Sequence, residues 1–251
     1  MSTILIVGDS YTYGQGCSDR IYYYDKKANQ HLGKYFEYPN DPASNDCWAT
    51  LLKQNLPTYN VINMASPGNS QFGIFKDVID NITDDTELVL FNATFLNRIS
   101  IASFGNPEII NPWSPTWYVD PDKEVTPMQS REYLLAKNAY MKYLVNDTIL
   151  QCQSIMSTLA AHSFVTGKNI KFLWSTPEQE ELVSLPIYQC LSVLEDIRFT
   201  HIARYDFSGR NDTNYNWRNF HFVDNHVNSL GHKVYFEKEL FPLVKRTLNI
   251  A

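Results

Sequence analysis

A serine near the start of the chain stands where a sheet protein can place its chemistry. The run Ile4–Val7 is unbroken and apolar, which is typical of a strand covered on both faces. It ends at Gly8-Asp9-Ser10, small and polar residues that suit a sharp turn. Ser10 would then follow the carboxyl end of a buried strand, where open α/β sheets bind their ligands. A helical turn after it would direct free backbone N–H groups at the same ligand.

The segment Gly-Asp-Ser-Tyr-Thr-Tyr-Gly at residues 8–14 resembles the first sequence block of the SGNH (GDSL-type) hydrolases. In that family the serine of this block is the nucleophile, so the resemblance implies that role for Ser10. The position of the block after the first strand strengthens the resemblance, because Gly-Asp-Ser alone is a common turn. Two alternatives stay open. One is a purely structural turn, and the other is a flavodoxin-like turn in which Ser10, Thr12 and Gly14 hold a phosphate or nucleotide.

A second segment, Val-Asp-Asn-His-Val-Asn-Ser-Leu-Gly-His at residues 223–232, resembles the last block of the family, Asp-x-x-His-Pro followed by Gly-His. His226 matches the catalytic base, and Gly231-His232 matches the pair at the start of the last helix. Valine stands three residues before His226, so the acid would be Asp224, which in extended backbone points to the same side. Val227 replaces the usual proline. The reserve candidates for base and acid are His221, His232 and Asp206.

Two further segments resemble the blocks that supply the oxyanion hole. Gly68 follows the second expected strand and matches a glycine whose backbone N–H donates to the oxyanion; glycine allows close backbone approach. After the third expected strand the usual Gly-x-Asn is altered, with Asn92 in the place of glycine and Thr94 in the place of asparagine. We choose Asn92 as the amide donor because it is nearest the strand end. Thr94 or Asn97 could fill the role instead, and the N–H of Ser10 would be the remaining donor.

The resemblance therefore implies a serine esterase. His226 would take the proton of Ser10, whose Oγ attacks the ester carbonyl, while Asp224 holds the imidazole. Water then releases the acid, and the reaction needs no metal or organic cofactor. A polar, aromatic insertion favours a glycan or other polar small-molecule ester over a long acyl chain as substrate. Because the third and last blocks depart from the family pattern, the alternative is an inactive binding module on the same fold.

Composition sets broader limits. The chain has 251 residues, of which 44% are hydrophobic and 19% charged, as in an ordinary globular domain. A formal net charge of −6 argues against a nucleic-acid partner. No secretory signal and no apolar stretch of about 20 residues is visible, so we expect a cytoplasmic protein without a membrane span. The sequence does not indicate an oligomeric state. Free thiols in a reduced compartment are the simplest interpretation of four cysteines that fit no metal motif, Cys17, Cys47, Cys152 and Cys190.

Strand and helix patterns alternate along the chain, which predicts a parallel sheet between helices. Strands are expected at residues 4–7, 59–63, 87–91, 170–175 and 200–205. Helices are expected from a cap at Ser44 or Asn45 to Pro57, at 70–81, 131–165 and 178–195 with a break at Pro186, and near the C-terminus. The predicted fold class is α/β, a three-layer α/β/α sandwich with roughly five parallel strands, flavodoxin-like as in SGNH hydrolases. We expect one domain, 1–251, with loop insertions at about 17–46 and 100–130.

Overall fold

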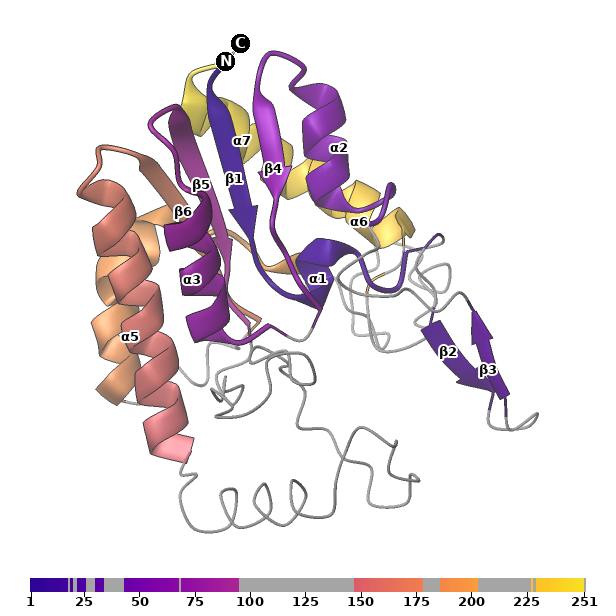
Figure 1. The fold of residues 1–251 in the computed structure, drawn as a ribbon, viewed down its shortest axis with the longest axis horizontal. Helices are drawn as coiled ribbons and strands as arrows, with labels where there is room; N and C mark the ends of the chain where they lie inside the picture. The colour runs from indigo at the N-terminus through magenta and orange to yellow at the C-terminus, as the bar shows by residue number, and fades with distance from the viewer. Residues whose placement is uncertain are drawn as a thin grey trace.

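A parallel sheet forms the centre of the molecule (Figure 1). The computed structural model describes residues 1–17, 19, 22–25, 30–33, 43–67, 69–94, 147–177, 186–202, 227 and 229–250. Within this part of the chain four parallel strands lie in the order β4-β1-β5-β6. Their bounds are Thr3–Val7 for β1, Asn60–Asn63 for β4, Thr86–Asn92 for β5 and Lys171–Ser175 for β6. The four strands confirm the first four that the sequence predicts.

Helices cover both faces of this sheet (Figure 1). On one face lie α3 (Gln71–Asn81), α5 (Asp147–Thr166) and the 3₁₀-helix η2 (Pro186–Ile197). On the other lie α2 (Trp48–Asn55), α6 (Ser229–Tyr235), the π-helical turn η5 (Phe236–Leu240) and α7 (Phe241–Leu248). The described residues thus form the three-layer α/β/α sandwich that the sequence predicts.

The strand β1 shows why two layers of helices are needed. Its side chains alternate, so Ile4 and Ile6 join the hydrophobic cluster under α2, α6 and α7, while Leu5 and Val7 join the cluster under α3 and α5. All four side chains are completely buried. The unbroken apolar run is therefore the sequence of a strand covered on both faces, as expected.

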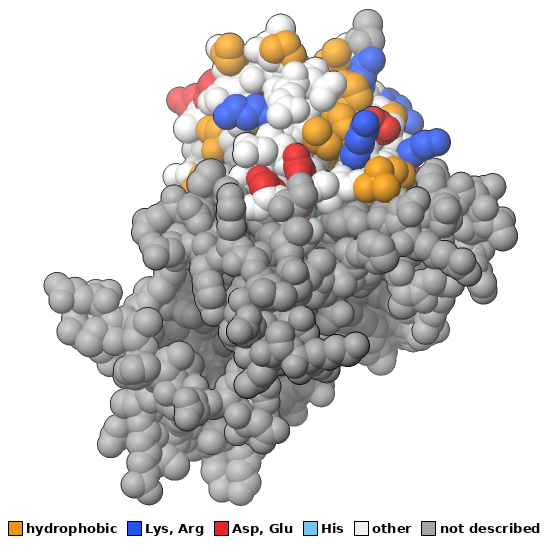
Figure 2. All heavy atoms as spheres, turned by 90° about the vertical axis from the view of Figure 1, so that its right-hand side faces the viewer, with side chains coloured by type: hydrophobic (Ala, Val, Ile, Leu, Met, Phe, Trp, Pro, Cys, Tyr) orange, Lys and Arg blue, Asp and Glu red, His pale blue; other side chains and the backbone are white. Residues whose placement is uncertain are grey.

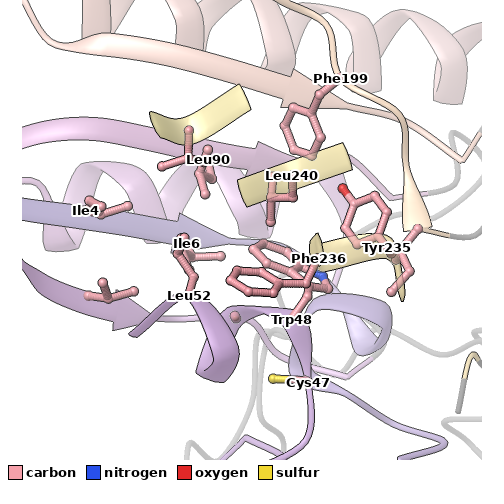
Figure 3. Packing of buried hydrophobic residues seen from close by; sticks show 14 of the residues in the cluster. Ile4, Ile6, Cys47, Trp48, Leu52, Leu90, Phe199, Tyr235, Phe236 and Leu240 are labelled. Carbon is pink, nitrogen blue, oxygen red and sulfur yellow. The ribbon is translucent and has the colours of Figure 1, made fainter. Parts of the chain in front are cut away.

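A tryptophan anchors the first of these clusters. Trp48, the first residue of α2, is fully buried and meets the ring of Tyr235 edge-on, with 6.3 Å between the ring centroids. Figure 3 shows it among Ile6, Leu52 and Phe236, which come from β1, α2 and η5. The indole is the largest fully buried side chain among the described residues, so we expect the stability of this layer to depend on it.

The cap of α2 differs from the prediction. The expected caps Ser44 and Asn45 lie before the helix, which begins at Trp48, and the side chain of Cys47 accepts no capping hydrogen bond from the backbone. Ser44 instead accepts a hydrogen bond from the N–H of Asp46. The Trp48 N–H donates to Nδ1 of the buried His232 at 3.2 Å, across 184 residues of sequence. The imidazole from α6 therefore satisfies a backbone donor that local caps normally satisfy.

The remaining strand and helix predictions have different outcomes. The fifth strand predicted at 200–205 is not found in its described part, residues 200–202, and residues 203–205 lie outside the described part. A single parallel bridge joins Arg198 to Trp174 of β6 instead. The predicted helices at 131–165 and 178–195 are described only from Asp147 and from Pro186 onward.

The predicted loop at 17–46 contains regular structure. Strand β2 (Tyr22–Asp25) pairs antiparallel with β3 (Gln30–Gly33), so a hairpin stands in part of the region expected to be irregular. Tyrosine favours strands, and the run of three tyrosines at 22–24 was the available signal. The predicted insertion at 100–130 lies outside the described residues, and the division into one domain stays a prediction.

The described surface has a mixed character. Figure 2 shows basic and acidic side chains interspersed with hydrophobic ones on one face of the molecule. Among the described helices, none combines the length and the apolar character needed to cross a membrane.

Candidate active site

The predicted nucleophile lies in a sharp turn at the carboxyl end of β1. Ser10 is the first residue of α1 (Ser10–Tyr13), a single helical turn, and is 2% exposed. The carboxylate of Asp9 caps this turn by accepting the N–H of Tyr11 at 3.0 Å. Gly14 ends it in the left-handed conformation, with φ 88°, and donates its N–H to the carbonyl of Ser10. The strand-turn-helix arrangement around Ser10 is therefore the one that the sequence predicts.

Close packing at Gly8 brings this turn against the end of β5. A Cβ atom at Gly8 would lie 2.3 Å from Oγ1 of Thr12 and 3.0 Å from Cβ of Asn92. Only glycine fits such a space without a shift of its neighbours. The parallel pairing of Val7 with Phe91 places the next residues of both strands at the same edge of the sheet. Asn92 therefore lies beside the turn that carries Ser10.

Only one of the two polar atoms in the Asn92 side chain has a hydrogen-bond partner among the described residues. The side chain is completely buried, and its Oδ1 accepts a hydrogen bond from Oγ of Ser175 at 2.6 Å. Its Nδ2 has no hydrogen-bond partner among the described residues. A buried donor left without an acceptor costs about 1–3 kcal/mol, so each such group calls for an explanation. Nε1 of Trp48 in the core also has no partner among the described residues, but of these two groups only the amide of Asn92 lies beside the turn of Ser10. A ligand oxygen at the end of β5 would supply the missing acceptor.

Thr94, the alternative donor, already uses its hydroxyl and its backbone N–H in other hydrogen bonds. Its Oγ1 donates to Oδ2 of Asp9 at 2.7 Å, and its backbone N–H donates to Oε1 of Gln71 at 2.9 Å. A hydroxyl has a single hydrogen to donate, and here that hydrogen holds the carboxylate that caps α1. This geometry favours Asn92 over Thr94 as the side-chain donor of the site.

Thr94 also begins a buried chain of polar side chains that sequence reasoning missed. Gln71, the first residue of α3, donates from Nε2 to Oγ1 of Thr158 on α5 at 2.6 Å. These hydrogen bonds link the Asp9 cap to α3 and α5, two helices of one outer layer. The four side chains that form them are nearly or completely buried. Isolated polar residues such as Gln71 carry no local motif, so only the packed structure brings them together.

The loop after β4 continues alongside β1 toward the same turn. The N–H of Met64 donates to the carbonyl of Ile6 at 2.9 Å, and that of Ser66 donates to the carbonyl of Gly8 at 3.2 Å. Gly68, the predicted oxyanion donor, follows this loop but lies outside the described residues. Its described neighbour Asn69 donates from Nδ2 to Oδ2 of Asp77 at 2.8 Å.

Asp77 is largely buried, which disfavours its charged form. Burial raises the pKa of the Asp77 carboxyl from 3.8 to about 6 despite the hydrogen bond from Asn69. A raised pKa means that the folded protein binds more protons than the unfolded chain between about pH 4 and 6, so the free energy of unfolding falls as pH rises through this window. Replacing Asp77 with asparagine removes the buried charge. We expect Asp77→Asn to raise the free energy of unfolding at pH 7 by about 1 kcal/mol, after discounting for partial exposure, and to leave it unchanged at pH 3.5.

Urea unfolding at the two pH values measures this difference. Asp80→Asn is the matched control, because Asp80 lies on the same helix with a half-exposed side chain paired with Lys76. An equal increase in the free energy of unfolding of Asp77→Asn at both pH values would contradict a raised pKa of the Asp77 carboxyl.

The predicted base and acid, His226 and Asp224, lie outside the described residues. The same holds for Asn97 and for the reserve candidates His221 and Asp206. The reserve candidate His232 is described, and it uses Nδ1 to cap α2, which is a structural role. Val227, next to His226 in sequence, is fully buried in the core cluster under α2, α6 and α7.

Comparison with known proteins gives a likeness in structure alone. No protein-family model matches the chain, and no curated protein matches it in sequence. The psychrotrophic esterase EstA from Pseudoalteromonas sp., solved with monoethylphosphonate as inhibitor, is 13% identical over 99% of this chain and 100% of its own, with a TM-score of 0.50. An active-site mutant of a family two carbohydrate esterase from Clostridium thermocellum is 12% identical over 100% of this chain, also with a TM-score of 0.50. This chain covers 65% of the length of that protein. At such identities the likeness concerns the fold, and the chain has the α/β fold of the SGNH-type esterases.

Proposed function

We propose that the protein is a serine esterase with Ser10 as its nucleophile. The observation that carries the proposal is the Asn92 amide, a buried donor with no acceptor among the described residues, beside the turn that holds Ser10. Ester hydrolysis passes through a tetrahedral intermediate whose oxyanion needs donors of this kind, already aimed at it. A purely structural turn would leave this side-chain amide without an acceptor.

The mechanism follows from the roles implied by the family resemblance. His226 takes the proton of Ser10 as its Oγ attacks the ester carbonyl, and Asp224 holds the imidazole in the correct tautomer. The backbone N–H groups of Ser10 and Gly68 and the amide of Asn92 bind the oxyanion. His226 then protonates the leaving alcohol, and water hydrolyses the acyl-enzyme by the same steps. The buried polar chain from Asp9 through Thr94 supports this proposal because it holds the nucleophile turn rigidly.

A polar ester, such as an acylated glycan or another small molecule, is the substrate class that we propose. The support is the tyrosine-rich, polar character of residues 17–46, which suits a sugar better than a long acyl chain. A carbohydrate esterase is also among the proteins that share the fold.

Labelling with a fluorophosphonate tests the proposal directly, because the reagent phosphonylates only an activated serine. We expect one added group on the wild-type protein by intact mass, mapped to Ser10, and none on Ser10→Ala or His226→Ala. Ser157→Ala is the matched control, because that serine lies on α5 and its hydroxyl donates to the carbonyl of Gln153. A well-folded wild-type protein that takes up no label would contradict the esterase and favour the binding module.

A further inference from the structure

The last residue of β6 holds the end of β5 by two separate contacts. Ser175 is completely buried and pairs with Asn92 in the parallel register of the two strands. Its carbonyl accepts the N–H of Ala93 at 2.7 Å, and its hydroxyl donates to Oδ1 of Asn92 at 2.6 Å. The backbone contact extends the sheet by one step, whereas the hydroxyl contact acts on the Asn92 side chain alone.

The hydroxyl contact decides which way the amide of Asn92 faces. A carboxamide is planar and carries its oxygen and its nitrogen on opposite branches, so fixing one also fixes the other. Strand β5 lies between β6 and β1 in the sheet. With Oδ1 bound to Ser175, Nδ2 occupies the other branch of the amide and has no partner among the described residues, while Cβ of Asn92 lies beside Gly8 of the nucleophile turn.

We propose that Ser175 is a positioning residue that holds the Asn92 amide with its N–H groups aimed at the oxyanion. The inference rests on the proposed function, and it assigns to Ser175 no contact with the substrate. Without the hydroxyl, nothing described holds Oδ1, and the amide can rotate about its last side-chain bond to find other partners for its N–H groups. Donors that must reorient during the reaction stabilise the transition state less than donors already in place.

A double-mutant cycle separates this role from a general structural one. Hydrolysis of p-nitrophenyl acetate is measured for the wild type, Ser175→Ala, Asn92→Ala and the double variant. We expect Asn92→Ala to lower kcat by about 10²–10³-fold. Ser175→Ala should lower kcat by about 10–100-fold with KM unchanged, as supporting residues commonly do. Because Ser175 acts through Asn92, the double variant should be no slower than Asn92→Ala.

Two results of the cycle would overturn the proposal. One is an unchanged kcat for Ser175→Ala, and the other is the same fold-loss from Ser175→Ala in both backgrounds. Ser157→Ala serves again as the control for loss of a buried serine hydroxyl. If Ser175→Ala does not fold, Ser175→Cys keeps the volume and retains only a weak donor, and the same comparison applies.

Crystal structures of the wild type and Ser175→Ala give a readout that needs no turnover. We expect the Asn92 amide to rotate in the variant, so that Oδ1 no longer lies beside residue 175, while the sheet is unchanged. An Asn92 side chain that keeps its orientation would overturn the positioning role. Absence of both hydrolysis and Ser10 labelling in the wild type would instead refute the proposed esterase, so the two failures are distinguishable.

Discussion

Ser10→Ala should lower the kcat of ester hydrolysis by about 10⁴-fold or more, because no other part of a serine site can replace the attacking oxygen. The residual rate would come from binding and from the oxyanion donors, which the substitution leaves in place. The thermal midpoint should change little, since the carboxylate of Asp9 and the N–H of Gly14 hold the turn. Stopped assays with p-nitrophenyl acetate and a thermal melt on the same samples measure both quantities.

Ser157→Ala, prepared identically, should retain the full wild-type rate, because that hydroxyl donates to the carbonyl of Gln153 on α5 and has no role in the site. Hydrolysis by Ser10→Ala at the rate of Ser157→Ala would mean that another group is the nucleophile. A large loss of stability in Ser10→Ala would make the kinetic loss uninformative about chemistry, and Ser10→Cys, which keeps a nucleophile of similar size, would then decide between the two causes.

Trp48→Ala should lower the free energy of unfolding by about 3–5 kcal/mol, the largest stability effect that we expect from a substitution among the described residues. The indole is fully buried, and its removal leaves a cavity between Tyr235 and the sheet that neighbouring side chains can fill only in part (Figure 3). For a domain of this size such a loss is a large fraction of the total stability. Urea unfolding, with the midpoint and slope fitted separately, measures it.

Phe72→Ala is the matched control for Trp48→Ala, because Phe72 is an aromatic residue on α3 that is 52% exposed. We expect it to change stability by no more than about 0.5 kcal/mol. Similar losses for the two variants would show that the layer formed by α2, α6 and α7 does not depend on the tryptophan.

Local patterns explain why the nucleophile turn could be predicted from sequence. The apolar run of β1, the Gly-Asp-Ser turn and Gly14 lie within a dozen residues, and each carries its own conformational preference. The same holds for the helix α3, whose N-cap Ser70 bonds the N–H of Gly73 as a local rule predicts.

Contacts between distant residues explain what the sequence could not show. Asp9 and Thr94 are 85 positions apart, and Asn92 and Ser175 are 83 apart, so no motif records that either pair meets. The cap of α2 by His232 was mispredicted for the same reason, since nearby Ser44 has the right residue type but bonds other groups. The roles of Asp224, His226 and Gly68 stay predictions.

The π-helical turn between α6 and α7 has a consequence for how this chain can vary. Buried side chains recur every fourth residue through His232, Phe236, Leu240, Val244 and Leu248. In a regular α-helix four such steps would rotate the last side chain about 160° away from the first. The wider turn, closed by the bond from the N–H of Phe241 to the carbonyl of Phe236, absorbs part of that drift and keeps the row facing the sheet. Loss of one residue here could restore a regular helix with every backbone bond made, yet it would turn α7 away from the core. Descendants of this sequence should therefore accept many substitutions in the helix and hardly any change in its length.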